Sequence, residues 1–133
     1  MFTRSAPVLA AVALLLAACR EPGGGLAARA TPGVLTVSLA APVEGDRALV
    51  VSITGPGAVG DVQPAPGYAA YTGMPGTATR VAVLGAIAAG PVLRFSVPDT
   101  RRAGEYRAAV VDAADEANVA RGDLAGYTLT VSR

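Results

Sequence analysis

The sequence predicts an all-β domain, an antiparallel β-sandwich of seven or eight short strands without disulfide bonds. Three observations predict it. From residue 34 to the C-terminus, apolar residues repeatedly alternate with polar or small ones, which is the period of a strand with one buried face. Turns containing glycine and proline separate these runs. After residue 18, no long stretch repeats at the 3.6-residue period of a helix, which favours a sandwich over a fold of alternating strands and helices.

The N-terminal strands show this alternation plainly. Residues 34–40 and 49–54 carry aliphatic side chains at every second position, and residues 42–46 form a turn between them. Residues 59–63 and 68–72 are shorter and are interrupted by proline and glycine, which is typical of edge strands. The inward positions of the first two strands would be Leu35, Val37, Leu39, Leu49, Val51 and Ile53.

The C-terminal half continues the pattern. Strands are expected from Thr79 to the turn at Gly85, over residues 92–97, from Tyr106 onward and from Tyr127 to the end. The alanine-rich residues 86–89 are ambiguous, and residues 112–120 are the only candidate helix, a short one. The inward positions here would be Val81, Val83, Leu93, Phe95, Val97, Tyr106, Ala108, Val110, Tyr127, Leu129 and Val131.

The N-terminus has the layout of a cleavable export signal. Arg4 is positive, residues 8–18 are apolar, and Leu16-Ala17-Ala18 precedes Cys19, the only cysteine of the chain. This segment resembles the lipobox of bacterial lipoproteins. The resemblance implies that residues 1–18 are a signal peptide that is removed, and that Cys19 then carries the membrane anchor, acyl chains such as palmitate. An uncleaved transmembrane helix, which needs about 20 apolar residues, and an ordinary secretory signal are the alternatives.

The expected domain organisation follows from this segment. Residues 19–32 contain Pro22, three successive glycines and Pro32, and are expected to form a flexible tether. Residues 33–133 would be the single sandwich domain, because roughly 100 residues build one core. Arg20 follows the cysteine where an aspartate would favour the inner membrane in enteric bacteria, so the outer membrane is favoured, and the face of that membrane stays open.

The composition excludes several kinds of function. The chain contains no histidine, lysine or tryptophan. It therefore lacks Ser–His or Cys–His pairs, lysine Schiff bases and ordinary zinc ligands, and we expect no enzyme, no metal and no cofactor. Without residues 1–18, ten arginines balance ten acidic residues. A neutral chain without a basic run also argues against a nucleic-acid partner.

One segment carries a further resemblance. Leu93-x-Phe95-x-Val97, then Asp99, then Ala103-Gly104-Glu105-Tyr106-Arg107-Ala108 resembles the passage from strand E to strand F of immunoglobulin-like domains. Tyr106 matches the corner tyrosine, whose hydroxyl bonds back to the corner in that family. Residues 127–131 resemble the following strand G. The strand series as a whole is also similar to cohesin-like sandwiches, which are likewise free of disulfides.

Two groups of side chains are candidates for ligand binding. Tyr68 and Tyr71 lie in a stretch rich in proline and glycine, where tyrosines either form a binding platform or cap a small core. Oxygen-bearing side chains gather before the last strand and suggest either a calcium loop, with spacing unlike an EF-hand, or a solvated acidic segment. This second group is Asp112, Asp115, Glu116, Asn118 and Asp123.

Three functions are compatible with these observations. The leading hypothesis is a lipid-anchored module of the bacterial cell envelope that acts without catalysis, as a protein-interaction or structural module. The first alternative is a ligand-binding module for carbohydrate or calcium, although tryptophan, which stacks on sugars, is absent. The second is a hydrolase that uses paired carboxylates. The tripeptide Arg121-Gly122-Asp123, which integrins recognise, is expected to be a turn.

Overall fold

The computed structural model describes residues 29–40, 42–74 and 77–133. Cys19 and the apolar segment before it lie outside these residues. The described chain forms eight strands and one short 3₁₀ helix, η1. These elements are β1 (Gly33–Ala40), β2 (Asp46–Thr54), β3 (Gly60–Pro64), β4 (Ala69–Gly73), β5 (Thr79–Leu84), β6 (Gly90–Val97), η1 (Thr100–Glu105), β7 (Arg107–Asp115) and β8 (Thr128–Ser132).

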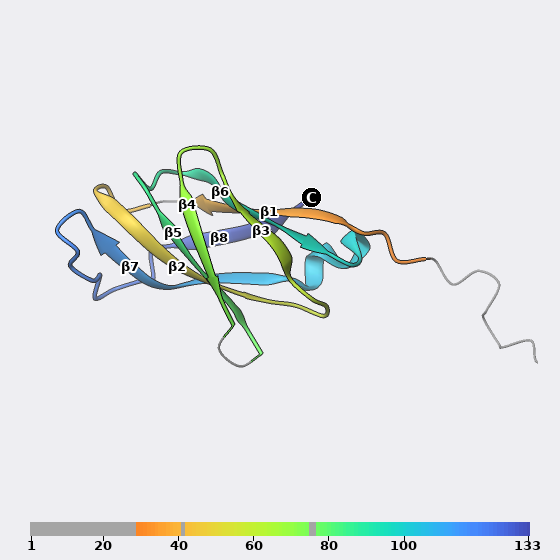
Figure 1. The fold of residues 1–133 in the computed structure, drawn as a ribbon. Helices are drawn as coiled ribbons and strands as arrows, with labels where there is room; N and C mark the ends of the chain where they lie inside the picture. The colour runs from red at the N-terminus through yellow and green to blue at the C-terminus, as the bar shows by residue number, and fades with distance from the viewer. Residues whose placement is uncertain (1–28, 41, 75–76) are drawn as a thin grey trace, which may run out of the picture.

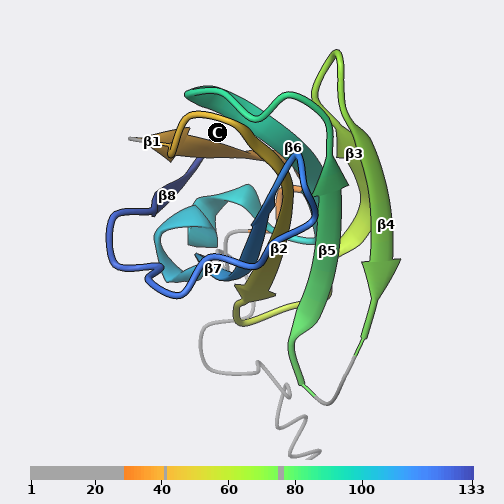
Figure 2. The ribbon, with the colours of Figure 1, turned by 90° about the vertical axis from the view of Figure 1, so that its left-hand side faces the viewer.

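The strands form two four-stranded antiparallel sheets, which pack as a sandwich (Figures 1 and 2). The β1 sheet has the order β3-β6-β1-β8, and the β2 sheet has the order β4-β5-β2-β7. The predicted all-β antiparallel sandwich is therefore confirmed, with eight strands. The two proline-flanked segments predicted as edge strands are β3 and β4, and each lies at one edge of its sheet.

The chain follows the path of a long hairpin folded over on itself. β1 pairs with β8, β2 with β7, β3 with β6 and β4 with β5. Every connection except the one between β4 and β5 passes from one sheet to the other. The last strand, which resembles strand G, pairs with β1 and not with β7, the strand after the tyrosine corner. Strands that are neighbours in sequence therefore mostly lie in different layers.

The core lies between the two sheets and is built from the alternating positions that the sequence predicts. Phe95, Leu35 and Leu49 are its largest fully buried side chains, and each such side chain contributes roughly 1.5–3 kcal/mol when it leaves water. Among the predicted inward residues of β7, β8 and their flanks, five are only partly buried, because both strands are sheet edges. These are Ala108, Val110, Tyr127, Leu129 and Val131.

Tyr106 closes the core at the corner between η1 and β7. Its side chain is 2% exposed, and its ring lies 5.8 Å from that of Phe95, tilted by 54°. A side chain at Gly55 would collide with this ring, so the turn after β2 needs glycine there. Among the described residues, the Tyr106 hydroxyl makes no hydrogen bond back to the corner. Tight packing holds this tyrosine in place.

The candidate helix over residues 112–120 was wrong. Residues 112–115 are the end of β7, which pairs with β2 as far as Asp46 opposite Asp115. A turn follows, and Ala114 bridges to Ala120. The helix preference of alanine is weak and yields to the backbone pairing of a neighbouring strand. In the described residues, no helix is long and apolar enough to cross a membrane.

Candidate functional site

Tyr68 caps the core and does not form an open platform. Its ring packs beside Gly85, where a Cβ atom would lie 2.7 Å from Cδ1 of the tyrosine. Its hydroxyl accepts a hydrogen bond from the backbone N–H of Ala88, at 3.1 Å. Both the ring and the hydroxyl of Tyr68 are therefore used inside the fold.

Tyr71 lies on β4 and points away from the core. Its side chain is 64% exposed. Ala70, the preceding residue, packs against the core instead, as the alternation of a strand requires. Of the two tyrosines that the sequence singles out, only Tyr71 therefore has an exposed side chain.

The acidic side chains before β8 mostly bond to their own backbone. Asp115 Oδ1 accepts hydrogen bonds from the N–H groups of Ala117 and Val119, both at 2.9 Å. Asp123 Oδ1 accepts one from Ala125, also at 2.9 Å. These are turn-forming bonds of the kind that aspartate makes to residues just ahead of it.

The remaining members of this group lie apart. Glu116 is 3.8 Å from Arg47 in an exposed ion pair, and Asp112 lies on β7 opposite Val50. In the described part of the chain, no three His, Cys, Asp or Glu side chains are placed to hold a metal ion together. The calcium alternative therefore gains no support from this segment.

A buried carboxylate holds the β7–β8 connection onto the start of β2. Asp46 is 1% exposed, and its Oδ1 lies 2.7 Å from Nε of Arg121. The Tyr127 hydroxyl donates a short hydrogen bond to Oδ2 of the same carboxylate. Arg121 also donates to the backbone oxygen of Glu44, at 3.3 Å. A residue at the start of β2 thus organises a segment that begins 75 positions later in the chain.

The electrostatics of this cluster follow from burial and hydrogen bonding. Burial and the hydrogen bond to Asp46 raise the pKa of the Tyr127 hydroxyl to about 12. The hydrogen bond to Asp46 also raises the pKa of the Arg121 guanidinium.

This cluster also accounts for the Arg-Gly-Asp tripeptide. Arg121 binds Asp46 and is therefore not free to act as an integrin ligand would require, and Asp123 closes a turn, as the sequence predicts.

The corner at η1 fixes the point where the chain enters the sandwich. The backbone N–H of Thr31 donates to Asp99 Oδ1 at 3.2 Å, and its carbonyl accepts from the Thr100 N–H at 2.7 Å. Hydrogen bonds from Arg101 hold the pKa of the Asp99 carboxyl well below its usual range. The last residues of the expected tether, 19–32, are therefore bonded to the domain. Figure 1 shows this N-terminal segment at the end of the sandwich opposite the β7–β8 connection.

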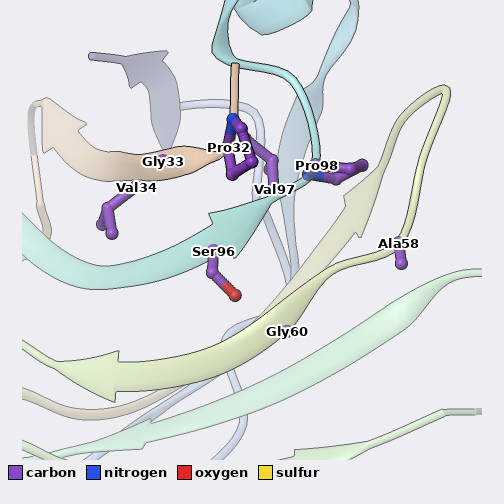
Figure 3. Close-up of a pocket in the computed structure, with 8 residues that line it drawn as sticks. All are labelled: Pro32, Gly33, Val34, Ala58, Gly60, Ser96, Val97 and Pro98. Atoms are coloured by element: carbon purple, nitrogen blue, oxygen red, sulfur yellow. The ribbon is translucent and has the colours of Figure 1, made fainter. Parts of the chain in front are cut away.

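A hollow of about 520 Å³ lies beside this N-terminal segment (Figure 3). It is open and shallow, and its lining is almost entirely apolar. The eight residues that line it are Pro32, Gly33, Val34, Ala58, Gly60, Ser96, Val97 and Pro98. Ser96 is its only polar side chain and no charged side chain lines it, so it offers little to orient a polar ligand.

The outer face of the β1 sheet is polar. Its strands place Gln63, Arg94, Thr36 and Ser132 in one cross-strand row, and Ser38 stands opposite Thr130 in another. Six of its side chains carry a hydroxyl group, and Val34, which is 54% exposed, is its largest apolar member. We call this surface the hydroxyl face. Its polar members are Thr36, Ser38, Asp61, Gln63, Arg94, Ser96, Thr128, Thr130 and Ser132.

The outer face of the β2 sheet is aliphatic. Its central row runs from Tyr71 through Ala82 and Val50 to Asp112. Leu84 and Val111 on the same face are 40% and 38% exposed. Arg80 and Asp112 are its charged members. We call this surface the apolar face. Its residues are Ala48, Val50, Ser52, Ala69, Tyr71, Arg80, Ala82, Leu84, Ala109, Val111, Asp112 and Ala114.

Sequence reasoning found only Tyr71 and Asp112 of this apolar face. The signal was present in β2 and β5, where most positions between the buried ones are aliphatic, as in Ala48, Val50, Ala82 and Leu84, and Arg80 is charged. Comparison with protein-family models, with curated proteins and with solved structures gives no match for this chain.

Proposed function

We propose that this chain is a lipid-anchored module of the bacterial cell envelope that acts by binding a flat, apolar protein surface, and not by catalysis. The observation that carries the proposal is the apolar face. It spans all four strands of the β2 sheet, and its one exposed aromatic side chain, Tyr71, is 64% exposed. Extended apolar surface of this kind marks interaction sites in proteins.

The chemistry of the face indicates the kind of partner. Arg80 and Asp112 carry opposite charges and lie on different strands, so the surface has no strong field of one sign. Tyrosine is among the residues enriched at the centre of protein interfaces. A charged ligand such as nucleic acid would need a basic surface instead. The composition supports a partner that is an uncharged protein surface.

The carboxylates support the non-catalytic part of the proposal. A hydrolase of the carboxylate class places two carboxyl groups about 5 to 9 Å apart across a cleft. Here Asp115 and Asp123 are occupied by backbone N–H groups, and Asp46 is buried with Arg121 and Tyr127. Asp112 projects from an open sheet face.

The anchor rests on the Leu16-Ala17-Ala18-Cys19 segment, and it is tested by Cys19→Ala. We expect this variant to lose incorporation of labelled palmitate and to leave the membrane fraction. Arg20→Ala is the matched control, because it changes the neighbouring residue and keeps the thiol. A Cys19→Ala chain that still carried the label, or that stayed membrane-bound, would overturn the lipid anchor.

The face is tested separately by placing a photo-reactive phenylalanine at Tyr71 in the intact envelope. We expect adducts with protein from position 71 and none from the same probe at Thr130, on the hydroxyl face. Equal adducts from both positions, or adducts from Thr130 alone, would show that the apolar face is not the binding surface.

A further inference from the structure

We propose that the partner of the apolar face is a second copy of this chain, bound about a two-fold axis that runs parallel to the strands between β5 and β2. This inference rests on the proposed interaction function. Such an axis places β4 of one protomer over β7 of its partner and β5 over β2, because a two-fold contact brings the same surface of each copy together. Residues of one cross-strand row then face the same row of the partner.

The side chains of the apolar face complement one another under this operation. Leu84 would lie over Ala48 of the second copy, and Arg80 over Ser52, so large side chains meet small ones. Val50 would lie over Ala82 in the same way. Each of these pairs follows from the register of β2 with β5. Side chains of two stacked sheets interdigitate best when bulk alternates across the contact.

The residues at the two ends of the central row would form polar contacts between the two copies. Tyr71 and Asp112 terminate the row at opposite edges of the sheet. The two-fold axis brings each Tyr71 hydroxyl, a donor, over an Asp112 carboxylate, an acceptor. Two such hydrogen bonds to charged groups would flank the aliphatic centre. The same row of the hydroxyl face ends in Gln63 and Ser132, which carry no charge and no aromatic ring.

The position of the tether selects this axis over one perpendicular to the strands. The chain enters at one end of the sandwich, where Thr31 is bonded to Asp99 and Thr100 (Figure 1). An axis parallel to the strands keeps the N-terminal segments of both copies at the same end of the dimer, so two N-terminal lipids can insert into one membrane. A perpendicular axis would point the two N-terminal segments in opposite directions.

The size of the face sets the strength of the contact. Four strands and three rows cover about 20 Å by 20 Å, or about 400 Å² of each copy. A stable complex buries about 800 Å² per partner. Contact in free solution is therefore weak, and anchoring in one membrane strengthens it by raising the effective concentration of copies.

The test is cross-linking of the full lipidated chain in the intact envelope. The variant carries both Tyr71→Cys and Asp112→Cys and is treated with a short bismaleimide, because stacked sheets lie about 10 Å apart, too far for a disulfide. We expect a covalent species of twice the chain mass, and only background from either single variant. The matched control is Gln63→Cys with Ser132→Cys, the two ends of the corresponding row on the hydroxyl face.

A second pair keeps the test decisive if the first variant does not fold. Ala69→Cys with Ala114→Cys replaces the ends of the neighbouring row, where both residues are small. Absence of the double-mass species from a folded, membrane-bound variant overturns the second copy as partner. A species joined to a different protein through the apolar face also overturns it. Both results leave the proposed interaction function standing, whereas a chain that is not anchored through Cys19 contradicts the proposed function itself.

Discussion

The two outer faces of this sandwich cover the same core and differ in chemistry. On the β1 sheet, the positions between buried residues are mainly serine and threonine, as in Thr36 and Ser38 of β1. On the β2 sheet, the same positions are mainly alanine, valine and leucine, as in Ala48 and Val50 of β2. Both choices satisfy a strand, since threonine and valine have similar β preference. Strand formation therefore does not require the difference.

Under the proposed function, core residues build the fold and the outward residues of the apolar face serve a partner. A solvated sheet face is usually polar, and the hydroxyl face follows this rule. The apolar face departs from it without gaining burial in the monomer, because Tyr71 and Leu84 remain exposed. Changes on the apolar face should alter association, and changes in the core or the Asp46 cluster should alter stability.

The largest effect is expected from Asp46→Ala, which removes the carboxylate that holds the β7–β8 connection onto the start of β2. The substitution leaves Arg121 and Tyr127 without their shared acceptor. We expect the free energy of unfolding to fall by about 3 kcal/mol, at the lower end for a broken buried pair because Arg121 is partly exposed. Urea unfolding followed by circular dichroism measures it. Glu105→Ala breaks the exposed Arg102 pair instead, and it should leave the free energy of unfolding almost unchanged.

A substitution at the centre of the apolar face tests most directly whether the two faces differ in association. Ala82→Glu places a charge where Val50 of the second copy would pack, and we expect at least a tenfold loss of the cross-linked species, or about 1.4 kcal/mol. The same residue on the hydroxyl face, in Thr36→Glu, should leave the yield unchanged. Both variants should keep the melting temperature of the unsubstituted chain. Equal losses from the two variants would mean that the faces do not differ in function.

Alkaline pH should weaken the connection that carries the chain from the β2 sheet to the β1 sheet. The pKa of Tyr127 is raised to about 12 in the folded chain, against an ordinary value of 10.0. The folded state therefore holds this proton more tightly, and the stability from it is complete below pH 10 and is lost as the pH rises towards 12. The absence of lysine keeps this window clear of other side chains except the tyrosines.

Tyr127→Phe isolates that contribution. We expect it to lower the free energy of unfolding by about 1 kcal/mol at neutral pH, the usual value of one hydrogen bond. It should also flatten the decline in stability between pH 10 and pH 12. Tyr71→Phe is the control, because the exposed Tyr71 hydroxyl makes no hydrogen bond to the described residues. An unchanged alkaline decline in Tyr127→Phe would contradict the assignment.

The smallest effects are expected from exposed substitutions that give one face the kind of side chain found on the other. Leu84→Thr on the apolar face and Thr130→Val on the hydroxyl face should each change the free energy of unfolding by less than about 0.5 kcal/mol, as exposed substitutions usually do. The cross-link yield should fall in Leu84→Thr alone. A stability loss above about 1 kcal/mol in Leu84→Thr would place that side chain in the fold and not in the interface.

The strands could be predicted because their signal is local. In β1, for example, Leu35, Val37 and Leu39 are buried as their spacing indicates. The candidate helix at 112–120 failed because pairing with β2, some 65 residues earlier, decides that segment. The contacts of Arg121 and of the two tyrosines could not be predicted for the same reason, because their partners lie far away in the sequence. Nothing near Arg121 indicates that it binds Asp46, and Tyr68 and Tyr71 look alike until one is packed against Gly85.

The sequence by itself determined the fold class and the in-or-out direction along the strands that alternate plainly, because period two is a property of neighbouring residues. Its composition, without histidine or lysine, also excludes the chemistries that need those side chains. It also carries the Leu16-Ala17-Ala18-Cys19 segment on which the proposed anchor rests. Only the tertiary structure decided which strands share a sheet, and therefore which outward residues form one surface. Tyr71 and Asp112 are 41 positions apart in the chain. They end one row because strand pairing, a long-range contact, brings β4, β5, β2 and β7 together.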